Sequence, residues 1–359
     1  MDKIRFGIVG SGWRTEFFLR IARELPERFA VTGVVTRKPE RAKALHDLFG
    51  VRAVATLEEL WQPLAPDFIV TSVPRAVNLE IISRIARQGI AILSETPPAG
   101  TLEELHRLHA LSTLGAKIQV AEQYFLQPQH AARLAFIATG KLGALSHANV
   151  SIAHGYHGIS LMRRFLGIGY ENCTIRAQNF KSKIIESRNR FKHPPEERLA
   201  DCNQIIASLD FGDKLALFDF TGEQYFSYMR RQRLTLRGTR GEIVNDEATF
   251  LVDQTTPVRV EFTRHFAGGP SNLEGHYLKG IQAGESWVYR NRLAPARLMD
   301  DEIAIAECLL GMAHYVRTGE DFYSLAEACQ DTYVDLMMQE AAKTGETVRT
   351  ETQAWAQAK

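Results

Sequence analysis

The chain has 359 residues, of which 45% are hydrophobic and 24% charged, and its formal net charge is +1. This length can bury two hydrophobic cores, and a charge so close to zero argues against nucleic acid or an anionic membrane as a partner. Arg5 interrupts the short N-terminal apolar run and no long uncharged apolar segment follows, so we expect no signal peptide or membrane span but a cytoplasmic protein. Four widely separated cysteines without a Cys-x-x-Cys pair favour reduced, buried thiols.

The N-terminal stretch has the order of elements of a βαβ unit. A short apolar run ends at Val9, a glycine turn follows, and an amphipathic run at 16–25 precedes a second apolar run at 29–35. Gly10 permits the tight turn, and Gly12 lets a diphosphate approach the backbone. The helix that starts there offers free N–H groups and the positive end of its dipole.

The match to a dinucleotide fingerprint is incomplete, because Thr15 stands where a third glycine is usual and would hold the helix slightly off the strand. A strand–turn–helix without a ligand is therefore the alternative interpretation. The turn nevertheless lies between an apolar run and a helix, which is the context that such a site requires. We expect the cofactor-binding residues of this turn to be Gly10, Ser11, Gly12, Trp13 and Arg14.

The end of the second apolar run bears on the choice between NAD and NADP. An NAD site usually has an acidic residue there, which holds the ribose 2′-hydroxyl. This chain offers Thr36, Arg37 and Lys38 instead. A hydroxyl and two cations suit a 2′-phosphate better, so the sequence slightly favours NADP, although the cations could simply be solvated loop charges.

Strands and helices continue to alternate as far as residue 121, which predicts a doubly wound parallel sheet. We expect strands at 52–55, 68–73, 90–94 and 117–121, and helices at 39–49, 57–61, 78–88 and 102–114. Ligands of such sheets lie at the carboxyl ends of the strands. The further residues expected there are Ser72, Val73, Pro74, Glu95, Thr96, Pro97, Glu122, Gln123 and Tyr124, of which we take Ser72–Pro74, Glu95, Thr96 and Gln123 as cofactor-binding.

The pattern changes after about residue 123, so we expect a Rossmann domain over 1–123 and an α+β domain over 124–359. Helices are predicted at 129–138, 157–166, 300–316 and 325–343, and strands at 144–152, 204–209, 215–220, 232–237, 243–244, 250–252 and 258–262. Turn signals between these strands indicate an open, mostly antiparallel sheet with one covered face. Residues 266–295, with their glycines and aromatic residues, are expected to form a long loop.

Several motifs in this order resemble the Gfo/Idh/MocA oxidoreductases, the family of glucose-fructose oxidoreductase and inositol dehydrogenase. They are Gly10-Ser11-Gly12, Glu95-Thr96-Pro97, the helix 157–167, and the segments 238–242 and 322–328. The resemblance implies a Rossmann domain followed by a domain with an open sheet on which homodimers or homotetramers form. It also implies NAD(P)-dependent hydride transfer to or from a sugar, a polyol or a related carbohydrate derivative.

The sequence departs from the family pattern at two catalytic positions. Thr96 replaces the usual lysine, and Ala153 replaces an aspartate that often stands four residues before the catalytic histidine. The histidine itself is retained as His157, and a helix start there would keep the imidazole neutral and basic. The resemblance thus implies proton transfer by His157, with Thr96 and Tyr124 positioning the substrate and Tyr156 assisting.

Other interpretations remain open at this stage. His157 could be structural and Tyr124 could pack in the core, while His154 and His157 lack a third ligand for a metal. The chain could be a cofactor-binding sensor or subunit without catalysis. It could also oxidise its substrate transiently, as a lyase or glycosidase with no net redox change.

Overall fold

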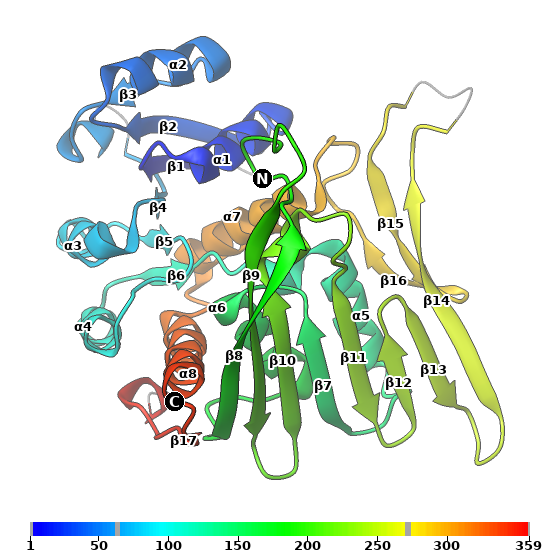
Figure 1. The fold of residues 1–359 in the computed structure, drawn as a ribbon. Helices are drawn as coiled ribbons and strands as arrows, with labels where there is room; N and C mark the ends of the chain where they lie inside the picture. The colour runs from blue at the N-terminus through cyan, green and yellow to red at the C-terminus, as the bar shows by residue number, and fades with distance from the viewer. Residues whose placement is uncertain (1–2, 62–64, 270–273, 358–359) are drawn as a thin grey trace.

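The computed structural model describes residues 3–61, 65–269 and 274–357. Within these residues the chain forms a sheet of six strands and a sheet of eleven, and Figure 1 shows the smaller one, in blue and cyan, to the upper left of the larger. The six strands pair in parallel in the order β3-β2-β1-β4-β5-β6. Their bounds are Ile4–Val9 (β1), Phe29–Val35 (β2), Ala53–Val54 (β3), Phe68–Thr71 (β4), Ile92–Ser94 (β5) and Ile118–Val120 (β6).

The predicted Rossmann order is therefore confirmed, and the central strands β4 and β5 are buried along their whole length. The connecting helices are Trp13–Glu24 (α1), Pro39–Phe49 (α2), Arg75–Ala86 (α3) and Leu102–Thr113 (α4). The helices α1 and α3 each begin three residues before the predicted start. The segment expected as a helix at 57–61 is a 3-10 turn, Glu58–Trp61 (η1).

The first turn of the unit is fixed by two contacts. Gly10 has a φ of +114°, and a Cβ there would collide with the carbonyl oxygen of Ser72. Thr15 is fully buried and its hydroxyl donates a 3.0 Å hydrogen bond to the carbonyl of Gly10. The threonine thus ties the helix α1 to the glycine turn at the position where a third glycine is usual.

The larger sheet has the order β16-β15-β14-β13-β12-β11-β7-β10-β9-β8-β17. Its neighbours pair antiparallel, except β7 and β10, which are parallel. The strands are Leu145–Ser151 (β7), Thr174–Ile185 (β8), Leu199–Asp210 (β9), Leu215–Thr221 (β10), Arg233–Gly238 (β11), Gly241–Val244 (β12), Glu247–Leu251 (β13), Pro257–Phe266 (β14), Leu278–Ala283 (β15), Ser286–Arg290 (β16) and Val348–Arg349 (β17).

The expectation of one long loop over 266–295 was wrong. Residues 278–283 and 286–290 form β15 and β16, which extend the sheet beyond β14. β15 pairs with β14 and β16 with β15, through backbone hydrogen bonds that the periodicity of these short runs does not reveal. Residues 270–273 of the expected loop lie outside the described residues. The long hairpin β8–β9 also exceeds the predicted strand at 204–209, because its exposed polar residues mask the alternation.

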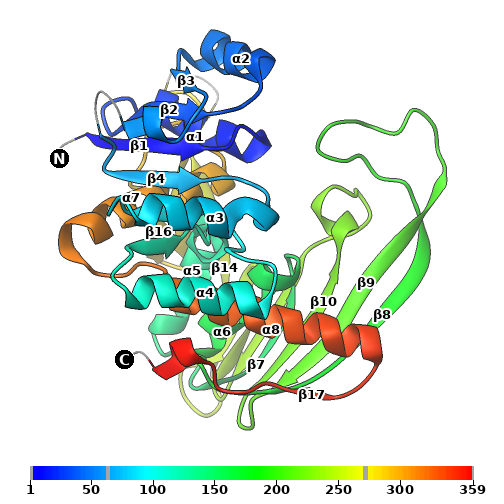
Figure 2. The same ribbon diagram turned by 90° about the vertical axis from the view of Figure 1, so that its left-hand side faces the viewer.

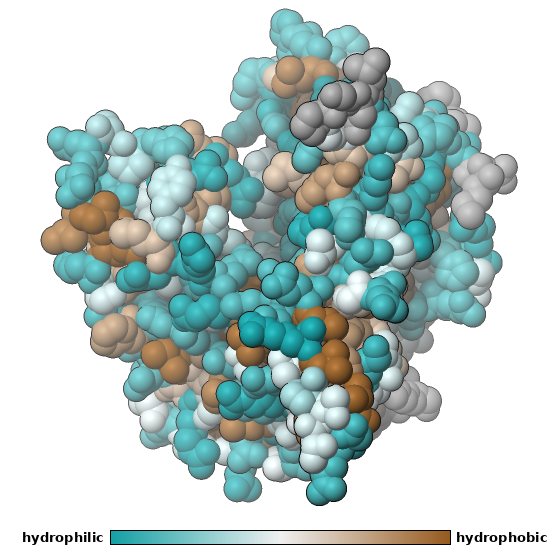
Figure 3. Space-filling model, turned by 90° about the vertical axis from the view of Figure 1, so that its right-hand side faces the viewer, coloured by the Kyte–Doolittle hydropathy of each residue, from teal (hydrophilic) through white to brown (hydrophobic). Residues whose placement is uncertain are grey.

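One face of the larger sheet is covered by Pro128–Ala138 (α5), Gly155–Leu166 (α6) and Leu325–Thr344 (α8). Figures 1 and 2 together show that, in the part of the chain that is described, no helix lies on the opposite face. Figure 3, which views the side that carries β14–β16, shows a hollow between two lobes and apolar side chains in separate patches. The open face therefore remains available for a partner.

The two sheets share their cores, because a helix from the end of the chain returns to the parallel sheet. Asp300–Thr318 (α7) packs Ile303, Leu309 and Met312 into one cluster with Phe6 and Phe18. The strand β6 is bordered by 322–324, through a hydrogen bond of 3.1 Å from the amide of Val120 to the carbonyl of Tyr323. A boundary at residue 123 therefore separates the strands of the two sheets, although α7, from the C-terminal part of the chain, packs against the parallel sheet.

Two further observations concern the whole described chain. All four cysteines are buried and free, as expected. Among the helices of the described residues, none combines the length and apolar character that crossing a membrane requires.

Candidate active site

A cavity of about 1000 Å³ opens at the carboxyl ends of β1, β2 and β4. Of the residues predicted to bind a dinucleotide, its wall contains Gly10, Ser11, Gly12, Thr36, Arg37, Val73 and Pro74. It also contains Lys38, Arg41, Glu58 and Arg84. Arg41, which the sequence analysis did not single out, donates a 2.8 Å hydrogen bond from Nε to the carbonyl of Ser11 and pairs with Glu16. No local signal marks Arg41, since it stands inside the helix α2.

The geometry of the glycine turn fits a dinucleotide. A Cβ at Gly12 would meet no atom within 4 Å, so the space in front of the first turn of α1 is open. Gly12 caps this helix without a side-chain hydrogen bond, which leaves the first N–H groups free for a diphosphate. The hydroxyls of Ser11 and Thr36 lie 2.8 Å apart at the ribose end, and the exposed Arg37 follows them. These residues could hold an adenine dinucleotide.

Glu122 and His157 form the central pair of the site. Oε2 of Glu122, just after β6, lies 2.6 Å from Nδ1 of His157 in the first turn of α6. The other carboxyl oxygen accepts a 3.1 Å hydrogen bond from the backbone N–H of Tyr124. Glu122 is fully buried and His157 is 4% exposed. The sequence placed Glu122 at the correct edge of the sheet but gave it no role, because its partner stands far along the chain.

Burial sets the protonation of this pair. It raises the pKa of Glu122 to about 8. Burial, and then the charge of Arg14, lowers the pKa of His157 to about 3. At neutral pH both side chains are therefore neutral, with the carboxyl proton in the hydrogen bond to Nδ1 and the imidazole proton on Nε2. Because Nδ1 is engaged with Glu122, Nε2 is the nitrogen left for a substrate.

Aromatic side chains and a second histidine surround the imidazole of His157. The ring of Tyr124 lies 4.4 Å from it, centroid to centroid, and that of His154 lies 4.9 Å away. The hydroxyl of Tyr225 accepts 3.1 Å hydrogen bonds from the hydroxyl of Tyr124 and the backbone N–H of His154. It also lies 2.7 Å from Nδ1 of His154. Burial lowers the pKa of His154 to about 3 and raises that of Tyr124, so both are neutral.

Arg14 connects the phosphate-binding turn to the other domain. Its guanidinium lies 3.4 Å from Glu95 and 3.0 Å from Asp301 at the start of α7. With the amide of Gln123 oriented to satisfy its neighbours, its oxygen accepts from Arg14 at 3.1 Å and its nitrogen donates to Ala121 at 3.0 Å. Burial raises the pKa of Glu95, and the charge of Arg14 opposes that shift. Arg14 thus joins Glu95 and Gln123, which follow β5 and β6, to the start of α7.

Three of the remaining predicted residues lie outside the lining of the cavity. Thr96 is half-buried, and its backbone N–H donates a 3.2 Å hydrogen bond to the carboxylate of Glu95. Trp13 stands 39% exposed at the start of α1. Ser72 lies behind Gly10 rather than in the wall of the cavity.

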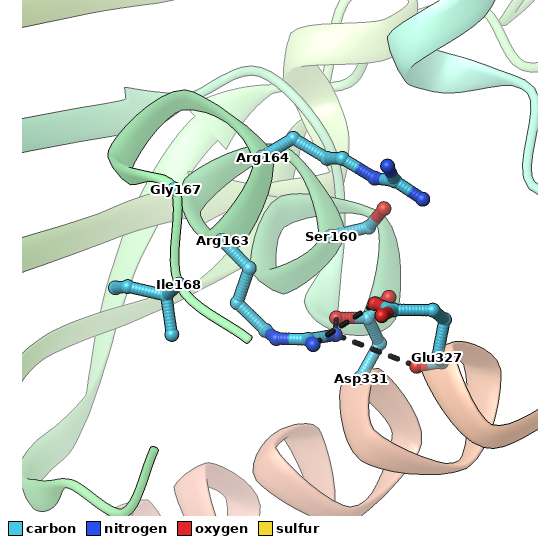
Figure 4. A pocket seen from close by; sticks show the side chains of 7 residues that line it. All are labelled: Ser160, Arg163, Arg164, Gly167, Ile168, Glu327 and Asp331. Atoms are coloured by element: carbon cyan, nitrogen blue, oxygen red, sulfur yellow. Dashed lines mark hydrogen bonds and ion pairs between the residues drawn. The ribbon is translucent and has the colours of Figure 1, made fainter. Parts of the chain in front are cut away.

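Tyr156 lies in the interior of the protein. It is 1% exposed, and its hydroxyl donates a 3.4 Å hydrogen bond to Tyr323, which in turn bonds to Asp331. Figure 4 shows the ion pairs of this interior region, in which Arg163 of α6 contacts Asp331 at 2.6 Å and Glu327 at 3.0 Å. The hydroxyl of Tyr156 therefore points toward α8, so the predicted assistance to proton transfer is not retained. The interior bonds fix α6, and with it His157.

Within the described ranges, no three His, Cys, Asp or Glu side chains are grouped so that they could hold a metal ion. His154 and His157 contact each other ring to ring instead.

Comparisons with known proteins agree with this geometry. Residues 4–121 match the Gfo/Idh/MocA oxidoreductase family, described as having an NAD-binding Rossmann fold. An uncharacterised oxidoreductase of Rhizobium meliloti is 27% identical over 150 residues, which cover 40% of this chain and only 43% of that protein. The resemblance drawn from the sequence motifs is thereby confirmed.

The fold of the whole chain is shared with solved dehydrogenase structures. Levoglucosan dehydrogenase in complex with NADH superposes with a TM-score of 0.70 and 15% identity, over 98% of this chain and 100% of that one. A myo-inositol dehydrogenase from Corynebacterium glutamicum gives 0.65 and 18%, over 98% and 100%. An oxidoreductase from Agrobacterium radiobacter in complex with NAD⁺, L-tartaric acid and magnesium gives 0.66 and 16%, over 97% and 98%. At these identities the likeness concerns the fold.

Proposed function

We propose that this chain, whose N-terminal domain is an NAD-binding Rossmann domain of the Gfo/Idh/MocA type, is a cytoplasmic NAD(P)-dependent dehydrogenase or reductase. Its substrate is a sugar, a polyol or a related carbohydrate derivative, and His157 transfers the proton. The observation that carries the proposal is the buried hydrogen bond between Glu122 and His157 at the carboxyl edge of that domain. The names of two structures of the same fold, a levoglucosan and a myo-inositol dehydrogenase, support the substrate class.

The proton must move at the atom that faces the substrate. When bound, the nicotinamide takes a hydride from an alcohol carbon or returns it to a carbonyl carbon. A hydride can leave the carbon only if the hydroxyl proton also leaves, so a base must lie within hydrogen-bond reach. Glu122 holds Nδ1 of His157 and fixes the tautomer, and Nε2 accepts or donates the proton of the reacting oxygen.

The protein compensates for the two altered catalytic positions. Ala153 is fully buried and carries no charge, so the carboxyl partner of the histidine comes from Glu122 instead. Tyr124 covers the imidazole and fixes its plane. Thr96 has no charge and does not titrate near neutrality, so we assign it substrate positioning rather than proton transfer.

The two alternatives to net oxidation predict different products. A sensor or subunit would bind NADPH and turn over nothing, whereas transient oxidation would change the carbohydrate without accumulating NAD(P)H. Net NAD(P)H formation over a panel of sugars and polyols, measured beside mass spectrometry of the products, separates these functions from the proposed one.

Replacing the base tests the proposal most directly. We expect His157→Ala to lower kcat by about 10²–10⁴-fold, the range typical of a lost general base, with cofactor affinity nearly unchanged. Steady-state rates and fluorescence titration with NADPH measure both quantities. His46→Ala, an exposed histidine on α2, is the matched control and should behave as the parent protein. Full turnover by the His157 variant would assign the base to another group, of which the neighbouring histidine His154 is the first candidate.

The pKa of Glu122, about 8, predicts how each direction depends on pH. Below it the carboxyl group donates to Nδ1 and Nε2 carries a proton, which suits protonation of a carbonyl oxygen. Above it the carboxylate accepts from Nδ1–H and Nε2 has a free lone pair, which suits alcohol oxidation. Oxidation should therefore rise through about pH 8 while carbonyl reduction falls, as initial rates between about pH 6 and 10 would show.

Glu122→Gln keeps the shape of the side chain but cannot ionise. In this variant the change near pH 8 should disappear from both directions, together with most of the activity. If the variant kept the same inflection, a different group would be responsible for it.

We also propose that NADP binds at least as well as NAD, because Thr36, Arg37 and Lys38 stand where an NAD site has an acid. Arg37→Asp should weaken NADP binding more than NAD binding, since it replaces a cation beside the 2′-phosphate with an anion. Titration of each cofactor against the variant and the parent gives the ratio. Arg87→Asp, an exposed arginine at the end of α3, is the control. Equal weakening of both cofactors, or tighter NAD binding by the parent protein, contradicts the preference.

A homodimer or homotetramer built on the open face of the larger sheet is the proposed assembly. Phe180, Ile206 and Leu215 stand 52%, 38% and 37% exposed on that face. Light scattering at micromolar concentration should give the mass of two or four chains, and Ile206→Asp should shift it toward one chain because a charge would be buried. Leu48→Asp, on α2, should leave the mass unchanged. A strictly monomeric parent would refute this assembly.

A further inference from the structure

The tip of the β8–β9 hairpin crosses from the larger sheet to the cofactor domain. Figure 2 shows this hairpin rising, at the right, to the height of the parallel sheet. The guanidinium of Arg190 at its tip lies 3.6 Å from the ring centroid of Trp13, at the start of α1. It also lies 5.8 Å from the ring of Phe226, in the other domain. Arg190 therefore lies close to an aromatic ring of each domain.

Aromatic side chains link Arg190 to the Glu122–His157 pair. Phe226 follows Tyr225, and their rings are 6.2 Å apart. The hydroxyl of Tyr225 bonds to that of Tyr124, whose ring covers His157. This sequence of contacts connects the guanidinium of Arg190 to the imidazole through the rings of Phe226, Tyr225 and Tyr124.

The charge of Arg190 is not neutralised within the protein. Among the described residues no carboxylate lies within ion-pair distance of it, whereas Arg198 at the base of the same hairpin is paired with Glu186. Arg14, a neighbouring cation, already forms ion pairs with both Glu95 and Asp301. Arg190 is exposed, so an anion from solution can reach it; desolvation and then the charge of Arg14 lower its pKa, and the charge of Asp301 opposes that shift.

We propose that Arg190 binds a carboxylate of the substrate, so that the substrate is a hydroxy acid of the carbohydrate series, such as an aldonate or a uronate, rather than a neutral sugar. This inference rests on the proposed function. The planar guanidinium matches a carboxylate with two parallel hydrogen bonds. The carboxylate is held while the hydride and the proton leave another carbon.

The test compares acids with their neutral partners. D-Gluconate with D-sorbitol, and D-glucuronate with D-glucose, are the two pairs of probes. Binding to the protein loaded with NADPH is measured by calorimetry, and kcat and KM are measured where turnover occurs. We expect the parent protein to prefer at least one acid over its partner. Arg190→Gln should weaken that acid by about 10–100-fold, mostly through Kd and KM, and leave the neutral compound nearly unchanged.

Two further variants sharpen the test. Arg188→Gln, an exposed arginine on the same hairpin, should leave every constant unchanged. Arg190→Lys keeps the charge but not the fork, so it should restore only part of the preference. Unchanged NADPH affinity in the Arg190 variant is part of the expected result. Equal loss of NADPH affinity with no change in the acid-to-neutral ratio would make Arg190 a cofactor ligand and overturn the inference.

The remaining outcomes separate this inference from the proposed function. Turnover of neutral compounds without binding of either acid overturns the carboxylate site and leaves the dehydrogenase function intact. Binding of acids that depends on Arg190, without net NAD(P)H formation, supports the carboxylate site and overturns net oxidation. Failure of both acids to bind, or tighter binding of D-glucose 6-phosphate that depends on Arg190, overturns the assignment to a carboxylate.

Discussion

The hydrogen bond between Glu122 and His157 joins the edge strand of the parallel sheet to the first turn of α6. Both side chains are buried, and a carboxyl group left there without a partner would carry the full cost of its desolvation. The bond therefore connects the two domains where the carboxyl ends of the parallel strands meet the helix α6 of the larger sheet. The cofactor cavity, the aromatic layer and the hairpin tip are all arranged around this point.

Further ion pairs fix the helices on either side of this hydrogen bond. On one side α7 returns to the parallel sheet, and its first residues pair with Arg14 at 3.0 Å and Arg20 at 2.6 Å. On the other side Arg163 anchors α6 to α8 through Asp331. Moving the two sheets independently would break the two ion pairs of α7, whereas the Arg163–Asp331 pair lies within the C-terminal domain. At the hairpin tip, Arg190 contacts Trp13.

Two positions depart from the family pattern that the sequence resembles. Thr96 is uncharged, and Arg14 is the cation that contacts the neighbouring Glu95. Ala153, which precedes α6, has no carboxyl group, and Glu122 is the carboxyl partner of His157.

The sequence alone determined the parallel sheet, the glycine turn and the position of His157 at a helix start. Each depends on local properties: burial with a regular period, the backbone freedom of Gly10, and the order of strands and helices along the chain. It also placed Glu122 at the carboxyl edge, since every parallel strand ends there.

Only the tertiary structure decided which of these groups meet. Glu122 and His157 stand 35 residues apart and Arg14 and Asp301 stand 287 apart, so no local pattern couples them. The direction of the Tyr156 hydroxyl, the pairing of β15 with β14, and the reach of Arg190 to Trp13 likewise depend on how distant segments pack. The fold of each segment follows from short-range periodicity, whereas the chemistry of the site follows from long-range contacts that periodicity does not encode.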